Sequence, residues 1–396
     1  MEAVKPTIPF SRPPLAGPEL EYLAEVVNGR ALAAHGRFSR LCETWLVANT
    51  GVGGAQLTQS CTRALELAAM LAGVHAGDEV IMPSFTFAST ANAVALRGGV
   101  PVFVDIRSDT LNIDEALIEP AITPRTKAVV PVHYAGVCAE MDAITAIGAR
   151  CGLTVIEDAA QALLSTYHGR PAGSLGDLGC FSFHQTKNVT AGEGGALLVK
   201  DAKLVSKARI VSDKGVDRES FLAGRKDHYE WVELGSSFGL SELSAAFLYA
   251  QLEASERFGR MRQTLWRRYD DNLAQLESEG LLRRPFVPEH CGHNGHLYYV
   301  LLADKTLRDS IIRALAGDGI TAPFHYIPLH TSEAGRRLGR AQGPLENTER
   351  ASACLLRLPL HAEMTPRDVD RVVERLHSHL RNARGATAPR SSVTAR

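Results

Sequence analysis

The sequence predicts an α/β protein built on a mostly parallel seven-stranded sheet. Three observations predict this class. Between about residue 55 and residue 212, short apolar runs rich in β-branched side chains alternate with segments of helical periodicity. The runs are apolar on both sides, as in strands that helices cover on both faces. The chain of 396 residues is also long enough for roughly two or three units with cores of their own.

Each strand of this first unit is predicted from a short apolar run, and each helix from a longer stretch with apolar residues at helical spacing. The predicted strands are 55–58, 79–82, 100–104, 127–132, 153–157, 180–183 and 196–199. The predicted helices are 62–71, 88–96, 114–121, 141–151 and 202–212. Ligands of such sheets bind at the carboxyl ends of the strands, so candidate site residues are sought there.

A long helical pattern connects this unit to a second, smaller one. The pattern opens at Ser241, a residue suited to cap a helix N-terminus, and continues to about Leu276. The smaller C-terminal α/β unit has predicted strands at 296–302 and 321–324 and predicted helices at 307–316 and 366–380. We therefore expect a large domain over residues 1–250, a small domain over 251–380 and a disordered tail over 381–396.

Charge and hydropathy argue against two classes of function. The chain has 43 Lys and Arg against 44 Asp and Glu, a net charge of −1, and so lacks the concentrated positive field of nucleic-acid binders and polybasic membrane proteins. No apolar stretch reaches about 18 residues, and Glu, Pro and Arg occur where a signal peptide would be apolar. We expect a cytoplasmic protein.

The seven cysteines indicate neither a disulfide framework nor a metal site. Their number is odd, and no two have the CxxC spacing of zinc and redox sites. Buried, reduced thiols are the expected state for most of them. We predict no bound metal.

Lys187 is the first residue whose surroundings suggest chemistry. It follows the aromatic strand end Phe181-Ser182-Phe183 and precedes the flexible turn Gly192-Glu193-Gly194-Gly195. An amine held there can form a Schiff base with a carbonyl while the backbone approaches closely. A single lysine is more often a solvated surface residue, so the hypothesis needs a second observation.

The segment Glu157-Asp158-Ala159-Ala160-Gln161 supplies one. Asp158 ends an apolar strand about 30 residues before the lysine, where its carboxylate could pair with a protonated ring nitrogen. That pairing keeps pyridoxal phosphate (PLP) an electron sink. Gln161, one helical turn further on, could hydrogen-bond a neighbouring ring oxygen. Taken alone, Asp158 is equally well explained as a helix N-cap.

Two further strand ends have residues suited to a cofactor. At residues 58–65 a strand passes through small hydroxyl side chains into a helix, whose free N–H groups and positive dipole end favour a phosphate. An ordinary Ser or Thr cap explains the same residues. At Pro83-Ser84-Phe85-Thr86-Phe87 an aromatic ring could stack on a cofactor, although a buried core Phe is the commoner explanation.

Other signatures are missing or ambiguous. The sequence has neither a glycine-rich dinucleotide fingerprint nor a Walker A lysine loop. His133, beside Tyr134, and His330, in Tyr326-Ile327-Pro328-Leu329-His330, could bind substrate. A structural role explains each histidine equally well.

Taken in order along the chain, these motifs resemble the DegT/DnrJ/EryC1/StrS family of sugar aminotransferases. The resemblance covers about residues 7–377. It rests on residues 60–65, 83–87, 157–161, 181–188 and 192–195. Within the family, residues 77–84, 131–137, 234–237 and 324–330 resemble the members that make dTDP-4-amino-4,6-dideoxygalactose.

The resemblance implies a fold-type I, PLP-dependent aminotransferase that acts as a homodimer with shared active sites. It implies that Lys187 forms the Schiff base with the cofactor, that Asp158 holds the pyridine nitrogen, and that Gln161 approaches the phenolic oxygen. Lys187 would also serve as general base and then general acid for proton transfer. Relatives that dehydrate deoxysugars have histidine in place of this lysine, so Lys187 counts against that branch.

The resemblance also implies which residues surround the cofactor and the sugar. Phe87 would cover one face of the ring, with Ala160 behind it. The phosphate would contact Cys61, Thr62 and Ser182. The sugar side of the site would lie under the loop that contains Tyr326 and His330. At Ser237 the chain departs from most members, which have an Asn that reaches the neighbouring subunit's phosphate.

The activity implied is transfer of the amino group of L-glutamate to C4 of dTDP-4-keto-6-deoxyglucose, giving dTDP-4-amino-4,6-dideoxygalactose and 2-oxoglutarate, a step in deoxysugar synthesis for a cell-surface polysaccharide. Transfer to a 3-keto sugar, or to C4 of a UDP-linked sugar, would use the same fold. A non-enzymatic PLP-binding regulator is a third hypothesis, and the intact Lys187 and Asp158 argue against it. The expected partners are the nucleotide sugar, L-glutamate and a second copy of the chain, with neither nucleic acid nor a membrane.

Overall fold

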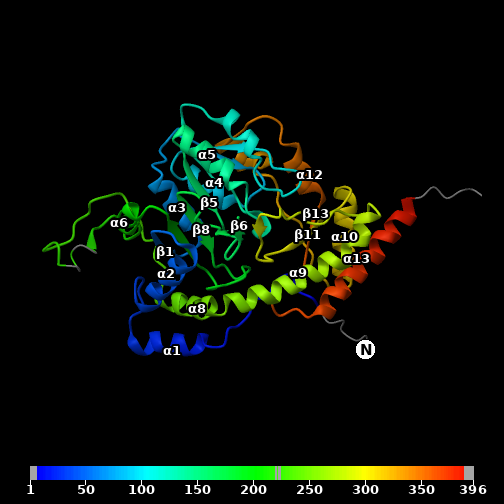
Figure 1. Cartoon of the computed structure of the whole chain (residues 1–396), viewed down its shortest axis with the longest axis horizontal. Coiled ribbons are helices and arrows are strands. Elements are labelled where there is room, and N and C mark those ends of the chain that lie inside the picture. The colour runs from blue at the N-terminus through cyan, green and yellow to red at the C-terminus, as the bar shows by residue number, and fades with distance from the viewer. Residues whose placement is uncertain (1–6, 219–220, 222–223, 388–396) are drawn as a thin grey trace, which may run out of the picture.

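The computed structural model describes residues 7–387 apart from 219–220 and 222–223. At its centre lies an eight-stranded sheet (Figure 1). The strand order is β1 (Gly54–Thr58), β9 (Gly195–Val199), β8 (Leu178–Ser182), β5 (Thr154–Asp158), β4 (Thr126–Val129), β2 (Glu79–Pro83), β3 (Val100–Val104) and β12 (Arg340–Ala341). Only β9 runs antiparallel to its neighbours, β1 and β8. The predicted α/β class and the seven predicted strands are confirmed, and β12 is the addition.

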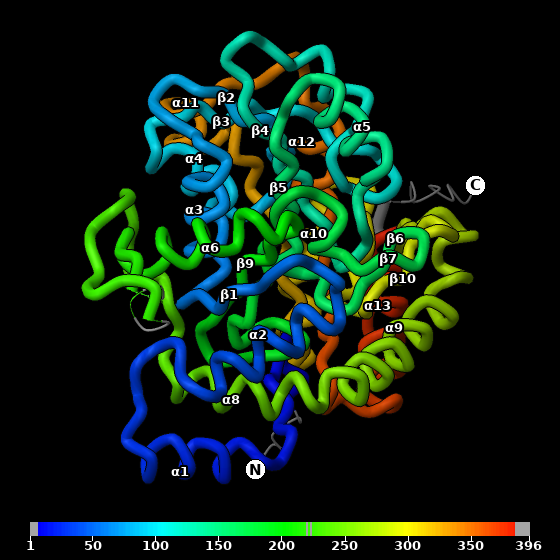
Figure 2. Tube along the Cα trace, turned by 60° about the vertical axis from the view of Figure 1, so that its left-hand side comes forward, coloured from blue at the N-terminus to red at the C-terminus, as the bar shows by residue number. Residues whose placement is uncertain are grey.

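Two groups of helices cover the two faces of this sheet. One face packs against α2 (Arg37–Thr50), α5 (Met141–Cys151) and α8 (Glu242–Glu253), and the other against α3 (Cys61–Leu71), α4 (Ala88–Ala95) and α6 (Ala202–Ser212). Successive strand residues point to opposite faces, so Ile81 joins the first core while Val80 and Met82 join the second. Both faces are buried, which is why the strand sequences are apolar throughout. Figure 2 shows α1 (Glu19–Gly29) lying below α8.

A separate apolar core forms at the C-terminal side of the molecule. It contains the antiparallel strands β11 (Tyr298–Leu301) and β13 (Leu355–Leu358), which are far apart in the sequence. They are covered by α9 (Ser255–Ser278), α10 (Lys305–Gly317) and α13 (Pro366–Thr387). Ile8, from the start of the described chain, packs into the same core. A domain boundary near residue 250 stays a proposal, and Ile8 belongs spatially to the smaller part.

The remaining described elements are short. They are α11 (Glu333–Leu338), α12 (Glu346–Cys354), the three-stranded sheet of β10 (Cys291–Gly292), β6 (Thr166–Tyr167) and β7 (Arg170–Pro171), and the 3₁₀ turns η3 (Tyr134–Gly136) and η4 (Leu329–Thr331). None of the described helices is both long enough and apolar enough to cross a membrane.

Two of the predicted helices differ from the structure. The segment 114–121 forms two 3₁₀ turns, η1 (Glu115–Leu117) and η2 (Glu119–Ala121), because Pro120 lacks an N–H group and constrains the residue before it. The long helix predicted from Ser241 is broken at Ala254 into α8 and α9. Ser241 does cap α8, since its hydroxyl accepts a hydrogen bond from the Ser244 N–H at 3.3 Å.

Two predictions for the C-terminal part are wrong. Residues 321–324 form no strand, because Ile320 makes only an isolated bridge with Ile8. The predicted disordered tail begins too early, since α13 continues to Thr387. Arg381 donates to both carboxylate oxygens of Glu279, at 2.7 and 2.9 Å, and this contact holds the helix end. Residues 388–396 lie outside the described residues.

Candidate active site

A cavity of about 570 Å³ opens at the carboxyl ends of the central strands. Its walls come from the segments that follow β1, β2, β4, β5 and β8. Of the candidate site residues, the two histidines His133 and His330 do not line it; those that do are Cys61, Thr62, Phe87, Asp158, Ala160, Gln161, Ser182, Lys187 and Tyr326. The structure therefore brings together residues that are up to 265 positions apart, from Cys61 to Tyr326.

Lys187 lies in the loop between β8 and β9, residues 183–194. Backbone hydrogen bonds close the loop, from the Lys187 N–H to the His184 carbonyl at 2.9 Å and from the Gln185 N–H to the Gly192 carbonyl at 2.8 Å. Gly192 has a φ of +77°, which favours glycine. Burial lowers the pKa of Lys187, and the charge of Arg357 acts in the same direction. Its amine is therefore more available as a nucleophile than that of a surface lysine.

Asp158 is the last residue of β5, and its side chain is fixed from two sides. The Thr90 hydroxyl donates to Oδ2 at 2.7 Å, and the Ala160 N–H donates to Oδ1 at 3.2 Å. The residues after Asp158 form a turn and no helix. The helix N-cap interpretation of Asp158 is therefore wrong, and so is the placement of Gln161 one helical turn further on. The carboxylate is left to interact with a cation in the cavity.

Gln161 and Tyr326 contact each other on the wall beside Asp158. The Ala135 N–H donates to Gln161 Oε1 at 2.7 Å, and Gln161 Nε2 donates to the Tyr326 hydroxyl at 3.0 Å. The Tyr326 ring stacks on His325 with 3.6 Å between centroids. Gln161 is thereby oriented with its amide group toward the cavity side, and one N–H of that group has no protein acceptor in the described chain.

The start of α3 forms the opposite end of the cavity. The Ser60 hydroxyl accepts from the Arg63 N–H at 3.2 Å, and the Thr62 and Ser89 hydroxyls lie 2.7 Å apart. The N–H groups of the first helical turn have no intrahelical acceptors. A Cβ on Gly195 would lie 2.4 Å from the Cys61 nitrogen, so only glycine lets β9 begin this close to the helix start. Hydroxyls, free N–H groups and the helix dipole suit this end to a phosphate.

These features together fit PLP. The amine of Lys187, the carboxylate of Asp158 and the phosphate-binding helix start face one cavity, while Phe87, 63% exposed, stands at its wall. A sequence model of the DegT/DnrJ/EryC1/StrS aminotransferase family matches residues 15–377. The chain belongs to this family. It is a PLP-dependent sugar aminotransferase.

Similar proteins cover nearly the whole aminotransferase. The spore coat polysaccharide biosynthesis protein SpsC of Bacillus subtilis (strain 168) is 35% identical over 384 residues, 95% of this chain and 98% of SpsC. The structure of DesI in the presence of its TDP-sugar product has a TM-score of 0.87 and 32% identity, covering 98% of this chain and 96% of DesI. Spr1654 of Streptococcus pneumoniae, in its PLP-form, has a TM-score of 0.88 and 26% identity, covering 95% and 99%.

His330 lies outside the cavity of the aminotransferase. Its Nδ1 is 2.7 Å from the Ser84 hydroxyl, and its Nε2 is 3.2 Å from a carboxylate oxygen of Glu349. Protein groups therefore occupy both ring nitrogens, which is the structural role that the sequence left open. Ser237 is exposed and pairs with Asp213 in an isolated bridge away from this cavity.

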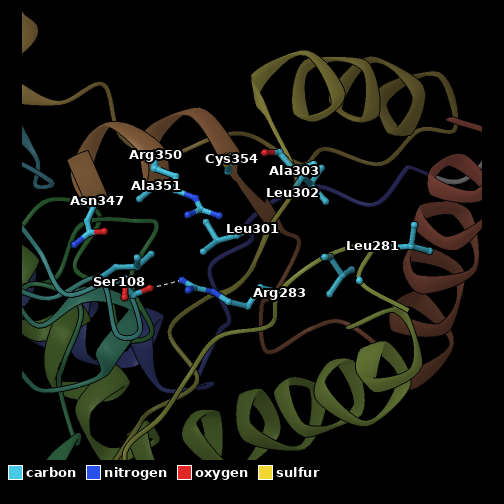
Figure 3. Close-up of a pocket in the computed structure, with 13 residues that line it drawn as sticks. Ser108, Leu281, Arg283, Leu301, Leu302, Ala303, Asn347, Arg350, Ala351 and Cys354 are labelled. Atoms are coloured by element: carbon cyan, nitrogen blue, oxygen red, sulfur yellow. Dashed lines mark hydrogen bonds between the residues drawn. The ribbon is translucent and has the colours of Figure 1, made fainter. Parts of the chain in front are cut away.

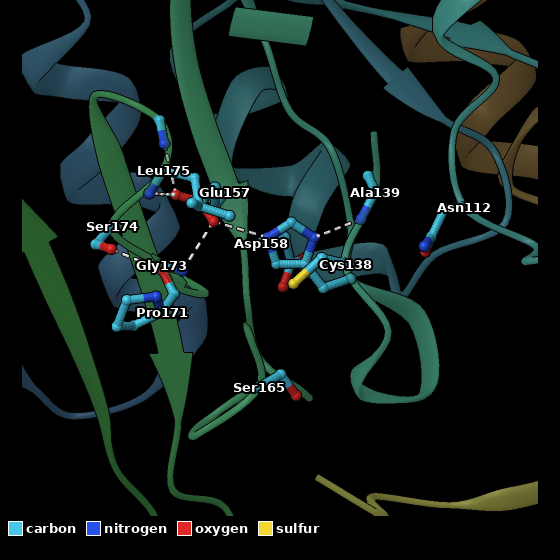
Figure 4. Close-up of polar contacts among 12 residues, drawn as sticks. Asn112, Cys138, Ala139, Glu157, Asp158, Ser165, Pro171, Gly173, Ser174 and Leu175 are labelled. Carbon is cyan, nitrogen blue, oxygen red and sulfur yellow. Dashed lines mark hydrogen bonds and ion pairs between the residues drawn. The ribbon is translucent and has the colours of Figure 1, made fainter. Parts of the chain in front are cut away.

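His133 is fully buried, and its backbone N–H donates to the Asp158 carbonyl at 3.1 Å. Its side-chain partners Glu157 and Ala139 are labelled in Figure 4. The Ala139 N–H donates to its Nδ1 at 3.2 Å, so its Nε2 bears the proton that faces Glu157 at 2.7 Å. Glu157 also accepts from the N–H groups of Gly173, Leu175 and Gly176. The pair ties β5 to two loops of the aminotransferase and does not reach the substrate cavity.

Among the cavity-lining residues that were not predicted are His296, His325 and Arg357. His296 is 2.9 Å from Asn188 through Nδ1, and burial lowers its pKa well below the ordinary value. Burial also lowers the pKa of His325 to about 2. Arg357 lies within the apolar strand β13, and a charged residue in such a strand was a usable signal. His296 stands in a loop without a distinctive pattern, whereas His325 lies within the stretch 324–330 and was not singled out there.

A second cavity, of about 350 Å³, lies between the loop that follows β3 and the C-terminal core (Figure 3). Arg283, Leu301, Arg350 and Cys354 are among its lining residues, and Arg283 donates to the Ser108 carbonyl. None of the predicted site residues reaches it. Within the described ranges, no group of three or more His, Cys, Asp and Glu side chains could hold a metal ion.

Proposed function

We propose that the aminotransferase transfers the amino group of L-glutamate to C4 of dTDP-4-keto-6-deoxyglucose, giving dTDP-4-amino-4,6-dideoxygalactose and 2-oxoglutarate. The observation that carries the transamination is the convergence of Lys187, Asp158 and the Gln161–Tyr326 pair on one cavity. The choice of sugar rests on the sequence stretches that resemble the dideoxygalactose branch. One of them, 324–330, contributes His325 and Tyr326 to the cavity wall.

Bound PLP supplies the electron sink that stabilises a carbanion at the donor's α-carbon. Cofactor attachment, proton transfer and phosphate binding are the roles of residues of the chain. Lys187 would hold the cofactor and would then take the α-proton of the donor at its Nζ, whose pKa burial lowers. Asp158 would keep the pyridine nitrogen protonated, because its anionic carboxylate favours the charged ring. The first turn of α3, with Cys61 and Thr62, would hold the phosphate together with Ser182.

The nucleotide part of the substrate is supported by similarity. DesI was solved with its TDP-sugar product, and SpsC bears the name of a polysaccharide biosynthesis protein. Both names fit a nucleotide-sugar substrate for this chain, and a role in building a cell-surface polysaccharide. Transfer to a 3-keto sugar or to a UDP-linked sugar remains the alternative to be tested.

We also propose that the enzyme is a homodimer. An arm, residues 224–237, projects from the body beside α6 (Figure 1). Its apolar side chains are exposed, with Tyr229 at 53%, Trp231 at 76%, Val232 at 48% and Leu234 at 52%. An exposed apolar patch of this kind is typical of a protein interface. A second copy of the chain would cover it, and Ser237 at its end would then lie near the partner.

The substrate is tested by incubating PLP-loaded enzyme and L-glutamate with dTDP- and UDP-linked 4-keto-6-deoxyglucose and a dTDP-linked 3-keto sugar in parallel. We expect the dTDP-4-keto sugar to be converted fastest, and NMR of the product to show an axial amino group at C4. Lys187→Ala serves as the inactive control. Faster conversion of the UDP-linked or the 3-keto sugar, or an equatorial amino group, would contradict the proposal.

A further inference from the structure

The guanidinium group of Arg357 lines the cavity, and it is held by two contacts while some of its N–H donors have no acceptor in the described chain. Its Nη2 donates to the Phe324 carbonyl at 3.1 Å, and its Cζ lies 4.5 Å from the centroid of the Phe10 ring. These two contacts fix the plane of the group. Its Nε is buried and has no hydrogen-bond partner, and its Nη1 makes no hydrogen bond within the described chain. Two of the three nitrogens therefore have all of their donors to spare.

The other charged groups of the cavity do not balance this cation. Among the described residues that line the cavity, the carboxylates are Asp158 and Glu193. Asp158 accepts from Thr90 and Ala160, and the Glu193 side chain is 70% exposed, 3.6 Å from His184. Arg262, the other arginine of the wall, already donates to the carbonyls of Gly295, His296 and Leu360. Arg357 is thus the arginine of the wall that can accept a new anion.

Arg357 is half-buried, and leaving its buried Nε without an acceptor is costly unless an anion or another acceptor joins it. Nε and Nη2 of one guanidinium present parallel N–H groups, which match the two oxygens of a carboxylate, and Nη2 has a second N–H besides the one donated to Phe324. Every L-amino acid donor brings such a carboxylate, attached to the same carbon as the reacting amine. A nucleotide sugar also brings anionic oxygens, but the width of the sugar ring separates its diphosphate from C4.

We propose that Arg357 binds the α-carboxylate of the amino-acid donor and thereby places the donor's α-carbon beside Lys187. This inference rests on the proposed transamination with an amino-acid donor and is independent of which sugar is aminated. The same contact serves the 2-oxo acid product, since its carboxylate occupies the same position. Arg357 and Lys187 line the same cavity, so a donor held by the guanidinium group lies in the space that the lysine also faces.

The first test isolates the donor half of the reaction by stopped-flow spectroscopy. The donor is the L-amino acid that the wild-type enzyme deaminates fastest, which we expect to be L-glutamate. Arg357→Met should raise the donor concentration for half-maximal rate about 10- to 100-fold, the range for losing a charge-assisted hydrogen bond. Its reaction from the aminated state with the keto sugar should stay within about threefold of wild type. Arg350→Gln, an exposed arginine of the second cavity, is the matched control and should change neither half.

The second test separates the carboxylate from the rest of the donor. Wild-type enzyme should prefer L-glutamate over its α-amide, L-isoglutamine, by about 10- to 100-fold, and this preference should nearly vanish in Arg357→Met. Calorimetric binding of 2-oxoglutarate to the PLP-loaded enzyme gives a readout without turnover and should weaken by a similar factor. Phe10→Leu, which removes the ring under the guanidinium, should weaken the same binding by a smaller factor and serves if the Met variant does not fold.

The outcomes distinguish this inference from the proposed function. An unchanged donor half together with weakened binding of dTDP would show that Arg357 binds the diphosphate instead. Equal slowing of both halves, or an unchanged preference for glutamate over isoglutamine, would also overturn the inference. A wild-type enzyme that aminates a different sugar would contradict the proposed substrate and leave the role of Arg357 standing.

Discussion

The side chain of Asp158 has two protein donors, and neither neutralises its charge. Thr90 and the Ala160 N–H orient the carboxylate, whereas a salt bridge would have compensated it. An oriented and uncompensated anion is what a protonated pyridine nitrogen requires. Thr90 belongs to α4, so the helix after β2 aims the catalytic carboxylate at the end of β5.

Asp158→Asn is expected to retain most PLP binding and to lose at least about 100-fold in turnover, because the amide cannot keep the ring nitrogen protonated. Steady-state kinetics and a PLP titration measure the two quantities. Asp201→Asn is the control, since Asp201 only caps α6 by accepting from the Lys203 N–H. Near wild-type turnover in the Asp158 variant would show that its charge has no part in the chemistry.

The phosphate end gives a second prediction for single residues. Thr62→Ala should weaken PLP affinity by about 1 to 3 kcal/mol, because it removes a hydroxyl hydrogen bond to a charged group. Ser237→Ala should have a smaller effect, since Ser237 lies away from the cavity of its own chain. Equilibrium titration of the apoenzyme with PLP compares the two. A larger loss for Ser237 would mean that it contributes to the phosphate site across the dimer.

The sequence could predict the residues at strand ends and could not predict those that the tertiary fold brings in from outside the main sheet. Asp158 and Lys187 follow apolar strands, so their positions were readable from local pattern. Arg357 and His296 approach the cavity from the smaller core, and no short-range pattern links them to Lys187. His330 shows the converse, because a loop sequence that suggests a binding site is satisfied by Ser84 and Glu349.

At the level of elements, the edge strand β12 depends on one buried carboxylate. Glu79, at the start of β2, accepts from Arg340 of β12 at 2.9 and 3.2 Å and from Arg125 at 2.6 Å. Its side chain is 1% exposed. The hydrogen bond from Arg340 is the largest contribution to lowering the pKa of Glu79 from 4.5 to about 2. A strand of two residues is too short to show a periodic pattern, so β12 was not predicted.

Glu79→Gln should lower the melting temperature at pH 7, with a loss of about 1 to 3 kcal/mol, because it removes charge-assisted hydrogen bonds. The folded-state pKa lies below 4.5, so this stabilisation is present above pH 4.5 and is lost as the pH falls toward 2. The difference between wild type and variant should therefore shrink from pH 7 to pH 4. Thermal melts at both pH values measure it, with Glu119→Gln, whose carboxylate is 59% exposed, as control. A pH-independent difference would contradict the ion-pair explanation.

At the scale of the whole molecule, the exposed arm is the feature on which the proposed dimer rests. The apolar residues Trp231, Val232 and Leu234 contribute little to either core of their own chain. They make sense as half of an isologous interface, in which each copy covers the same patch on the other.

Trp231→Glu should dissociate the proposed dimer, because it introduces a charge at the centre of the arm. Sedimentation velocity should show a monomer, and PLP affinity and turnover should fall together. Phe286→Glu, which changes a residue 49% exposed outside the arm, should leave the sedimentation coefficient unchanged. A Trp231 variant that stays dimeric, or a fully active monomer, would rule out the arm as an interface needed for catalysis.

Ile8 and Phe10 contact residues in the C-terminal part of the described chain, which affects when this part of the enzyme can fold during synthesis. The Ile8 N–H donates to the Gly319 carbonyl at 2.8 Å, the Thr321 N–H donates to the Ile8 carbonyl at 3.1 Å, and Phe10 lies under Arg357. At a translation rate of about 5–20 residues per second, these partners are synthesised roughly 15 to 60 seconds after residue 8. The main sheet can form within that interval. The part of the cavity wall that Phe10 and Arg357 form is therefore among the last parts of the enzyme to assemble, after most of the chain has been synthesised.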